Sequence, residues 1–128
     1  MKKTRILFAL VFVLLLSLSA CSKGSYTVVV GDETNQSTKK AMVYQAFSGY
    51  KSYEFTVKEG EEITIHVSIV TEEGEINAYI AKDNDVKQAV YEGTAIPTSD
   101  FTVTIKESGT YTIRVDAKQH KGSYSFTW

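Results

Sequence analysis

The only cysteine of the chain, Cys21, directly follows a hydrophobic segment and two small residues, in the order Leu18-Ser19-Ala20-Cys21. With no second cysteine, the chain cannot form an internal disulfide, so the thiol is free for another reaction. Small side chains at Ser19 and Ala20 would let a peptidase cut the chain before Cys21. The spacing therefore predicts cleavage between Ala20 and Cys21, which would leave the Cys21 thiol at the new N-terminus.

The residues before Cys21 have the parts of a secretory signal. Three of the first five residues are basic, and an uncharged apolar segment follows from Ile6 to about Leu16. This segment is shorter than the roughly 20 apolar residues that span a membrane. An ordinary cleaved signal and an uncleaved membrane anchor are the alternatives, but neither explains why the only cysteine stands at this position.

Together these features resemble the lipobox signal of bacterial lipoproteins. The resemblance implies attachment of a diacylglycerol group to the Cys21 thiol. It also implies a helical signal peptide over residues 1–20, which is cleaved, and a lipidated tether over residues 21–25. Two or three acyl chains, such as palmitate, on Cys21 would hold the protein stably on a lipid membrane. We therefore expect the protein on the extracytoplasmic face of the cell membrane or the outer membrane.

Residues 26–128 have the length of one folded domain, with no proline-rich or glycine-rich linker dividing them. Three of the 14 basic residues of the chain belong to the signal, whereas all 15 acidic residues follow it. The resulting acidic balance argues against a nucleic-acid partner, because binding to phosphates needs a basic surface. It also leaves membrane attachment to the acyl chains.

Apolar and polar residues alternate with a period of two along most of this domain, as in strands with one buried and one solvated face. The alternation is strongest in residues 53–58, 63–69, 101–106, 111–116 and 123–128. Weaker strands are expected at residues 26–30, 42–47, 76–81 and 86–91. Glycine-containing turns separate the segments, for example at Gly74 and Gly122. About eight or nine antiparallel strands predict an all-β fold, either a sandwich or a closed barrel.

Two parts of the domain show a more specific pattern. Phe55–Val67 consists of two alternating stretches around Gly60, and Glu107–Val115 and Gly122–Phe126 form a second pair of stretches. These parts resemble the pre-peptidase C-terminal domain that is appended to secreted bacterial proteases. The resemblance covers about residues 50–128 and implies a jelly-roll-like antiparallel β-sandwich without catalytic activity.

Tyrosines are the most promising ligand-binding residues, and all eight lie after the signal. Three of them fit the alternation of a core, Tyr26 stands at the expected start of the fold, and four others do not fit: Tyr44, Tyr50, Tyr79 and Tyr91. Exposed tyrosine rings on a sandwich are suited to stacking sugars or docking peptides. These four residues are therefore candidate ligand contacts; alternatively, they cover the ends of the sandwich.

Other chemistry-bearing residues are few. Asp83 and Asp85 flank Asn84 in an expected loop, and such oxygen donors suit Ca²⁺, although a plain turn explains the same residues. No other cofactor is predicted. The two histidines, His66 and His120, are expected as solvated surface residues, since neither belongs to a recognisable catalytic or zinc-binding motif.

The sequence therefore predicts a lipid-anchored, non-catalytic binding module at the cell envelope, with a glycan, a peptide or an envelope protein as its partner. A hydrolase, or an accessory subunit of one, is the alternative from another class. It would require His66 to share a concave site with acidic residues. A third possibility is a purely structural spacer or an inhibitor-like module.

Overall fold

The structure, a computed structural model, describes residues 23–128. The signal peptide and its helix, the cleavage site at Ala20 and the lipidation site at Cys21 lie outside these residues. Within the described part of the chain, no helix is long and apolar enough to cross a membrane.

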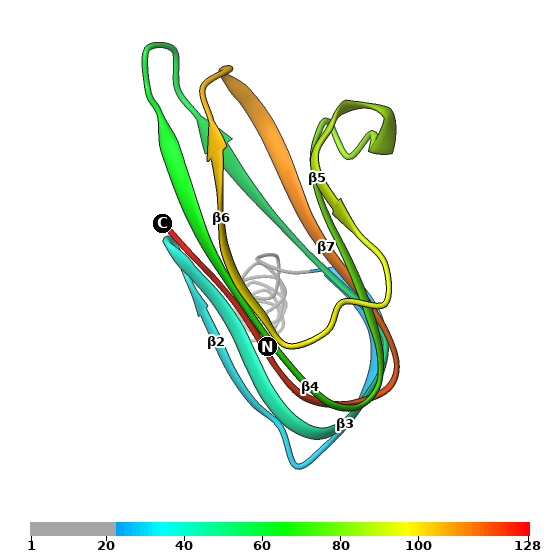
Figure 1. Ribbon diagram of the computed structural model, residues 1–128. Helices are drawn as coiled ribbons and strands as arrows, with labels where there is room; N and C mark the ends of the chain where they lie inside the picture. Colours follow the sequence, from blue (N-terminus) through cyan, green and yellow to red (C-terminus); the bar gives the residue numbers. More distant parts are fainter. Residues whose placement is uncertain (1–22) are drawn as a thin grey trace, which may run out of the picture.

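Seven antiparallel strands and one short 3-10 helix make up this part of the chain (Figure 1). They are β1 (Lys23–Val29), β2 (Asp32–Gln36), β3 (Lys39–Val57), β4 (Ile63–Lys82), η1 (Val86–Gln88), β5 (Ala89–Gly93), β6 (Ser99–Ile105) and β7 (Gly109–Thr127). The all-β antiparallel prediction is confirmed. The structure has seven strands instead of the expected eight or nine, because three of the strands are far longer than the alternating segments suggested.

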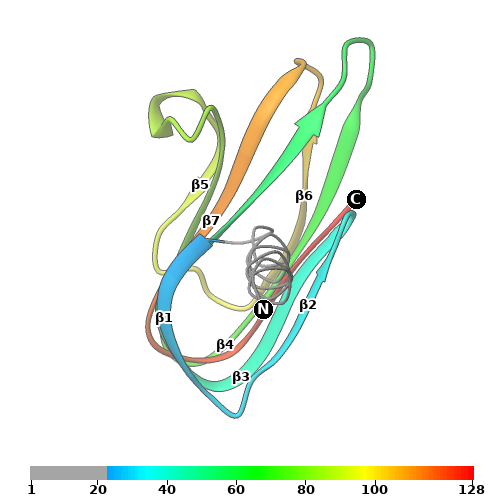
Figure 2. The same ribbon diagram turned by 180° about the vertical axis from the view of Figure 1, so that it is seen from behind.

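These three strands, β3, β4 and β7, each bend and contribute to both layers of a β-sandwich. The first layer consists of β2, the first half of β3, the second half of β7, the first half of β4, and β6. The second layer consists of β1, the second half of β3, the first half of β7, the second half of β4, and β5. Figure 1 and Figure 2 show the layers joined along one line of bends and diverging from it.

The bends occur where the strand pairing is irregular. Register shifts lie between Tyr44 and Gly49 in β3 and between Thr71 and Glu75 in β4. In β7 the bend includes Gly122, whose φ is +142°. A Cβ at this position would lie 1.9 Å from the carbonyl oxygen of Val70 on the neighbouring strand. Glycine is therefore required here for both its backbone conformation and the close approach of β4.

The core lies between the layers and consists of the inward side chains of the alternating segments. All five segments with the strongest predicted alternation are strands, and their apolar side chains face the core; Ile65 and Ile113, for example, are fully buried. The C-terminal Trp128 extends from the first layer and packs on Phe55 of the second layer, with ring centroids 4.9 Å apart. The two layers are thus connected by shared strands and by side-chain packing.

Candidate functional site

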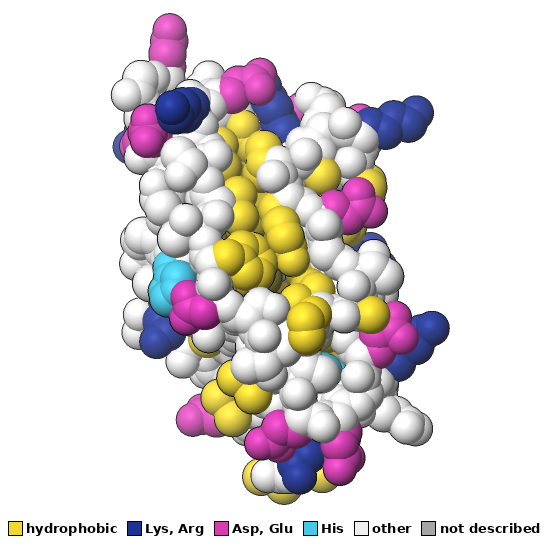
Figure 3. Space-filling model, in the orientation of Figure 1, with side chains coloured by type: hydrophobic (Ala, Val, Ile, Leu, Met, Phe, Trp, Pro, Cys, Tyr) yellow, Lys and Arg dark blue, Asp and Glu magenta, His cyan; other side chains and the backbone are white. Residues whose placement is uncertain are grey.

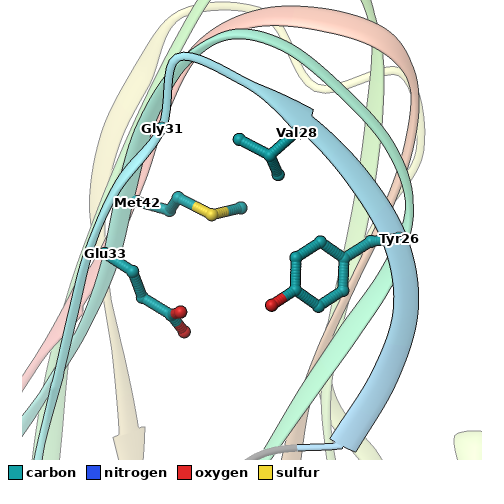
Figure 4. Close-up of a pocket in the computed structure, with 5 residues that line it drawn as sticks. All are labelled: Tyr26, Val28, Gly31, Glu33 and Met42. Carbon is teal, nitrogen blue, oxygen red and sulfur yellow. The ribbon is translucent and has the colours of Figure 1, made fainter.

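The edge of the sandwich formed by β1 and β2 contains a pocket between the two layers. Its volume is about 290 Å³. The lining residues are Tyr26, Val28, Gly31, Glu33 and Met42. Figure 4 shows the Tyr26 hydroxyl and the Glu33 carboxylate directed toward one another across the opening, with Val28 and Met42 nearer the bend. The pocket therefore has one polar side and one apolar side.

A buried charge cluster adjoins the pocket, because Glu33 belongs to both. Lys51 of β3 is only 1% exposed, and its ammonium group forms an ion pair with Glu33 Oε1 of β2. This ion pair bridges the two layers through the interior. The Glu33 side chain is 32% exposed, so it connects the buried ammonium with the solvent.

Tyrosines surround this ion pair. The Lys51 ammonium lies 4.7 Å from the centre of the Tyr26 ring and 5.7 Å from that of Tyr53. Tyr53 donates a hydrogen bond to Glu33 at 3.2 Å, so the Tyr124 hydroxyl, 2.6 Å away, must donate to Tyr53. Burial raises the pKa of both Tyr53 and Tyr124 above the usual value of 10.0, which keeps both hydroxyls protonated as donors.

A second buried lysine lies in the same cluster. Lys40 is 7% exposed, and its ammonium group donates to the Asn35 side-chain oxygen at 2.6 Å. It also lies 5.8 Å from the centre of the Tyr53 ring. Among residues 23–128, no carboxylate forms an ion pair with Lys40. The inner side of this edge therefore holds two ammonium groups and one carboxylate.

A second candidate site lies on the outer face of the second layer. Tyr50, Arg114 and Tyr79 occupy three adjacent strands, β3, β7 and β4, and both tyrosines are half-buried. The Arg114 guanidinium lies 4.1 Å from the centre of the Tyr50 ring and forms two hydrogen bonds with Asp116, at 2.9 and 3.0 Å. These hydrogen bonds raise the pKa of Arg114. The arrangement is a row of planar side chains across a sheet face.

The four tyrosines singled out in the sequence therefore do not form one site. Tyr50 and Tyr79 share this outer face. Tyr44 is 3% exposed and lies in the core, so it presents no surface to a ligand. Tyr91 points inward and packs on Phe101 in a tilted arrangement with ring centroids 4.9 Å apart, and its burial raises the pKa of its hydroxyl.

Figure 3, which views the molecule from the side of β5 and β6, shows a band of hydrophobic side chains between the layers.

The aspartate loop lies between β4 and η1. Asp85 caps η1 by accepting a hydrogen bond from the Lys87 backbone, and Asn84 accepts one from the Tyr79 hydroxyl at 2.7 Å. Asp83 and Asn84 both have positive φ, 55° and 53°, as residues of a tight turn do. In the described part of the chain, no group of three acidic, histidine or cysteine side chains is arranged to hold a metal ion. Calcium binding by Asp83 and Asp85 stays a prediction.

The prediction that both histidines are solvated is wrong for His120. Its side chain is fully buried at the line of bends, where Tyr44 and Thr71 bind the two ring nitrogens. The sequence around it, Lys-Gln-His-Lys, is typical of a polar turn, which concealed its burial. His66 is exposed, as expected, and contacts Asp100 on the outer face of the first layer. Both side chains of this pair are more than half exposed.

The charge cluster of Glu33, Lys40 and Lys51 was not predicted from the sequence, although a signal was present. Lys51 lies two residues before Tyr53 and therefore falls on the same buried face of the strand as Tyr53, Phe55 and Val57. Lys40, two residues before Met42, shares the buried face of Met42 in the same way. A lysine that falls on the buried face of a strand is a departure from the pattern and marks a site that needs a polar partner.

No family model matches the sequence, and no curated protein matches it. Solved structures with a similar fold include a low affinity xylan binding module, CBM86, from Roseburia intestinalis, with 8% identity and a TM-score of 0.41 over 83% of this chain and 90% of that chain. The pre-peptidase C-terminal domain of a collagenase from Bacillus anthracis has 13% identity and a TM-score of 0.41, covering 84% and 88%. TmCBM61, in complex with β-1,4-galactotriose, has 15% identity and a TM-score of 0.42, covering 82% and 81%. At these identities the likeness extends to the β-sandwich fold alone.

Proposed function

We propose that the mature chain is a non-catalytic binding module of the bacterial cell envelope, held on the extracytoplasmic face of a membrane by acyl chains on Cys21. The observation that carries the binding role is the row of Tyr50, Arg114 and Tyr79 on the outer face of the second layer. Half-buried tyrosine rings offer flat apolar surface at little cost in side-chain entropy, and their hydroxyls add hydrogen bonds.

The spacing of this row suits an extended ligand. Neighbouring strands are about 4.8 Å apart, so the backbones of Tyr50 and Tyr79, two strands apart, are separated by roughly 10 Å. Arg114 lies on the strand between them, where its ion pair with Asp116 fixes the guanidinium. A glycan chain or an extended peptide that crosses the strands would contact both rings and the polar groups between them.

The binding role is tested with residues 21–128 carrying Cys21→Ser, which removes the anchor. We expect this protein to bind at least one member of a panel of envelope glycans and peptides. Tyr50→Ala and Tyr79→Ala should each weaken that binding about fivefold, since a stacked aromatic ring contributes on the order of 1 kcal/mol. Isothermal titration calorimetry measures the affinities.

The control for this experiment is His66→Ala, which removes an exposed ring from the outer face of the other layer. It should bind as the unaltered protein does. Equal affinity in the double variant Tyr50→Ala, Tyr79→Ala would refute the assigned face. Hydrolysis of any panel member, lost in the His66→Ala variant, would instead support the hydrolase alternative.

The anchor is tested separately in a bacterial host. Cys21→Ala removes the only thiol, so we expect the protein to leave the membrane fraction, because two or more acyl chains are needed for stable attachment. Ser22→Ala is the matched control and should remain in that fraction. Membrane fractionation and mass spectrometry of the mature N-terminus provide the measurement. A Cys21→Ala protein that still pellets with membranes, or a wild-type Cys21 without acyl mass, would overturn the proposed anchor.

A further inference from the structure

We infer that the β1/β2 edge of the sandwich is a binding site for an oxyanion, the carboxylate or phosphate group of a small ligand or of a lipid headgroup. This inference goes beyond the binding face proposed above and does not depend on it. The site consists of Lys40, Lys51 and Glu33, together with the pocket that Glu33 helps to line.

The first step is the charge balance of the cluster. Lys40 and Lys51 are only 7% and 1% exposed as whole residues, and Glu33 is the single carboxylate of residues 23–128 that forms an ion pair with either. Glu33 pairs with Lys51, whereas Lys40 has a neutral amide partner, Asn35. The cluster therefore carries an excess of one positive charge, and both of its lysines are almost completely buried.

The second step is the cost of that excess. A buried charge is unfavourable unless it is paired, and a neutral hydrogen-bond partner compensates only part of the lost hydration. The Tyr53 ring, within 6 Å of both ammonium groups, contributes a weaker cation–π attraction. An incoming oxyanion would supply the missing negative charge, and its binding would be strongest in this desolvated setting.

The third step is access for a ligand. Asn35, the partner of Lys40, is exposed on the edge strand β2, and the Glu33 side chain is partly exposed. The adjoining pocket of about 290 Å³ can hold the apolar part of a small molecule against Val28 and Met42 (Figure 4). The ligand class is accordingly a small molecule with one anionic group and an apolar body, or a lipid headgroup with its first carbon atoms.

Four proteins test this inference, all built on residues 21–128 with Cys21→Ser. They are the parent, Lys40→Met, Glu33→Gln and Lys58→Met. Lys40→Met keeps most of the length of the side chain and removes the excess charge. Glu33→Gln removes the carboxylate of the cluster, so the excess positive charge rises from one to two. Lys58→Met changes an exposed lysine of the β3–β4 loop and is the matched control.

The measurement is the chemical-shift change of backbone amides in β2 and β3 on titration with inorganic phosphate or butyrate at constant ionic strength. We expect saturable shifts around Lys40 in the parent and the same affinity in Lys58→Met. The affinity should be more than tenfold weaker in Lys40→Met and several-fold stronger in Glu33→Gln. Thermal unfolding midpoints at low millimolar anion should rise in the same order. General salting effects act on all four proteins equally and cancel in the comparison.

Vesicles of phosphatidylglycerol, tested by co-sedimentation with the same four proteins, identify the source of the anion. Binding to vesicles in the same order would assign the site to lipid headgroups, and binding of the free anions alone would assign it to a soluble ligand. The inference is overturned if no probe binds, if Lys40→Met binds as tightly as the parent, or if Glu33→Gln weakens the binding.

Discussion

The proton positions around His120 follow from counting donors. The Thr71 hydroxyl has a single proton, which it donates to the Ile96 carbonyl at 2.9 Å. Thr71 must therefore accept from His120 Nε2, 2.8 Å away, and this fixes the tautomer with its proton on Nε2. His120 Nδ1 is left as an acceptor for the Tyr44 hydroxyl at 2.5 Å. A second proton on the ring would remove this acceptor and leave the buried Tyr44 proton without a partner.

This arrangement predicts a pH dependence of stability. Burial lowers the pKa of His120 below the usual 6.5, so the folded protein binds fewer protons than the unfolded chain in this range. The contribution of His120 to stability is therefore complete above pH 6.5 and is lost as the pH falls below it, with a slope of up to about 1.4 kcal/mol per pH unit. Urea unfolding at several pH values between 8 and 5 measures it.

His120→Gln should abolish that slope, because glutamine remains neutral at every pH in the range. His66→Gln is the matched control and should keep the slope, since His66 lies exposed on a strand face. An identical slope in the parent and in His120→Gln would show that other groups cause the acid sensitivity.

At the scale of the element, the bends in β3, β4 and β7 determine the architecture. Each bend moves a strand from one layer to the other without a break in the chain, so the two layers share three strands. The residues at the bends are consequently more constrained than those of an ordinary surface turn. Gly122 has the closest approach to a neighbouring backbone among the glycines of the described strands and turns.

Gly122→Ala should therefore be strongly destabilising. The new Cβ would require a positive φ in a non-glycine residue and would overlap the Val70 carbonyl, so we expect a loss well above 1 kcal/mol in the free energy of unfolding. Gly60→Ala is the control, because Gly60 also has a positive φ, +78°, but a Cβ added there would meet no atom within 4 Å. Chemical denaturation that gives equal losses for both variants would contradict the role of close packing at the bend.

The bends also explain what could be predicted from the sequence. Alternation assigned the buried faces correctly, for example at Ile65 and Tyr111, because the period of two is a local property of a strand. It could not reveal the strand count, since a glycine such as Gly74 or Gly122 is equally suited to a hairpin turn between strands and to a bend within one. Whether the chain reverses or continues depends on its neighbours in the sheet.

The candidate sites were predictable to different degrees for the same reason. Tyr50 and Tyr79 were singled out, with Tyr44 and Tyr91, because none of the four fits the expected core alternation. Their placement on one face with Arg114 depends on the order of β3, β7 and β4, which is a property of the whole sheet. The pairing of Glu33 with Lys51 depends on two strands from different layers, and no local pattern encodes it.

At the scale of the whole molecule, the shared strands join the two layers into one cooperative unit. Unfolding of one layer would release one half of each shared strand and expose the side chains packed against it, because β3, β4 and β7 extend through both layers. We expect a single unfolding transition in which Trp128 fluorescence coincides with far-ultraviolet circular dichroism. Trp128 reports on both layers, since it belongs to the first and packs on Phe55 of the second. Separate midpoints for the two signals would show that the layers unfold independently.

If the chain is anchored ahead of Lys23, as proposed above, the position of β1 at the sheet edge has a mechanical consequence. Among the described strands, β1 has one hydrogen-bonded neighbour, β3, and their pairing starts with Lys23 opposite Ser52. Tension on the tether would break the hydrogen-bonded residue pairs between β1 and β3 one after another, starting at Lys23, so β1 would separate from the sheet first. Because Tyr26 and Val28 line the pocket from β1, pulling on the tether would dismantle the pocket while the five strands β3 to β7 still held together.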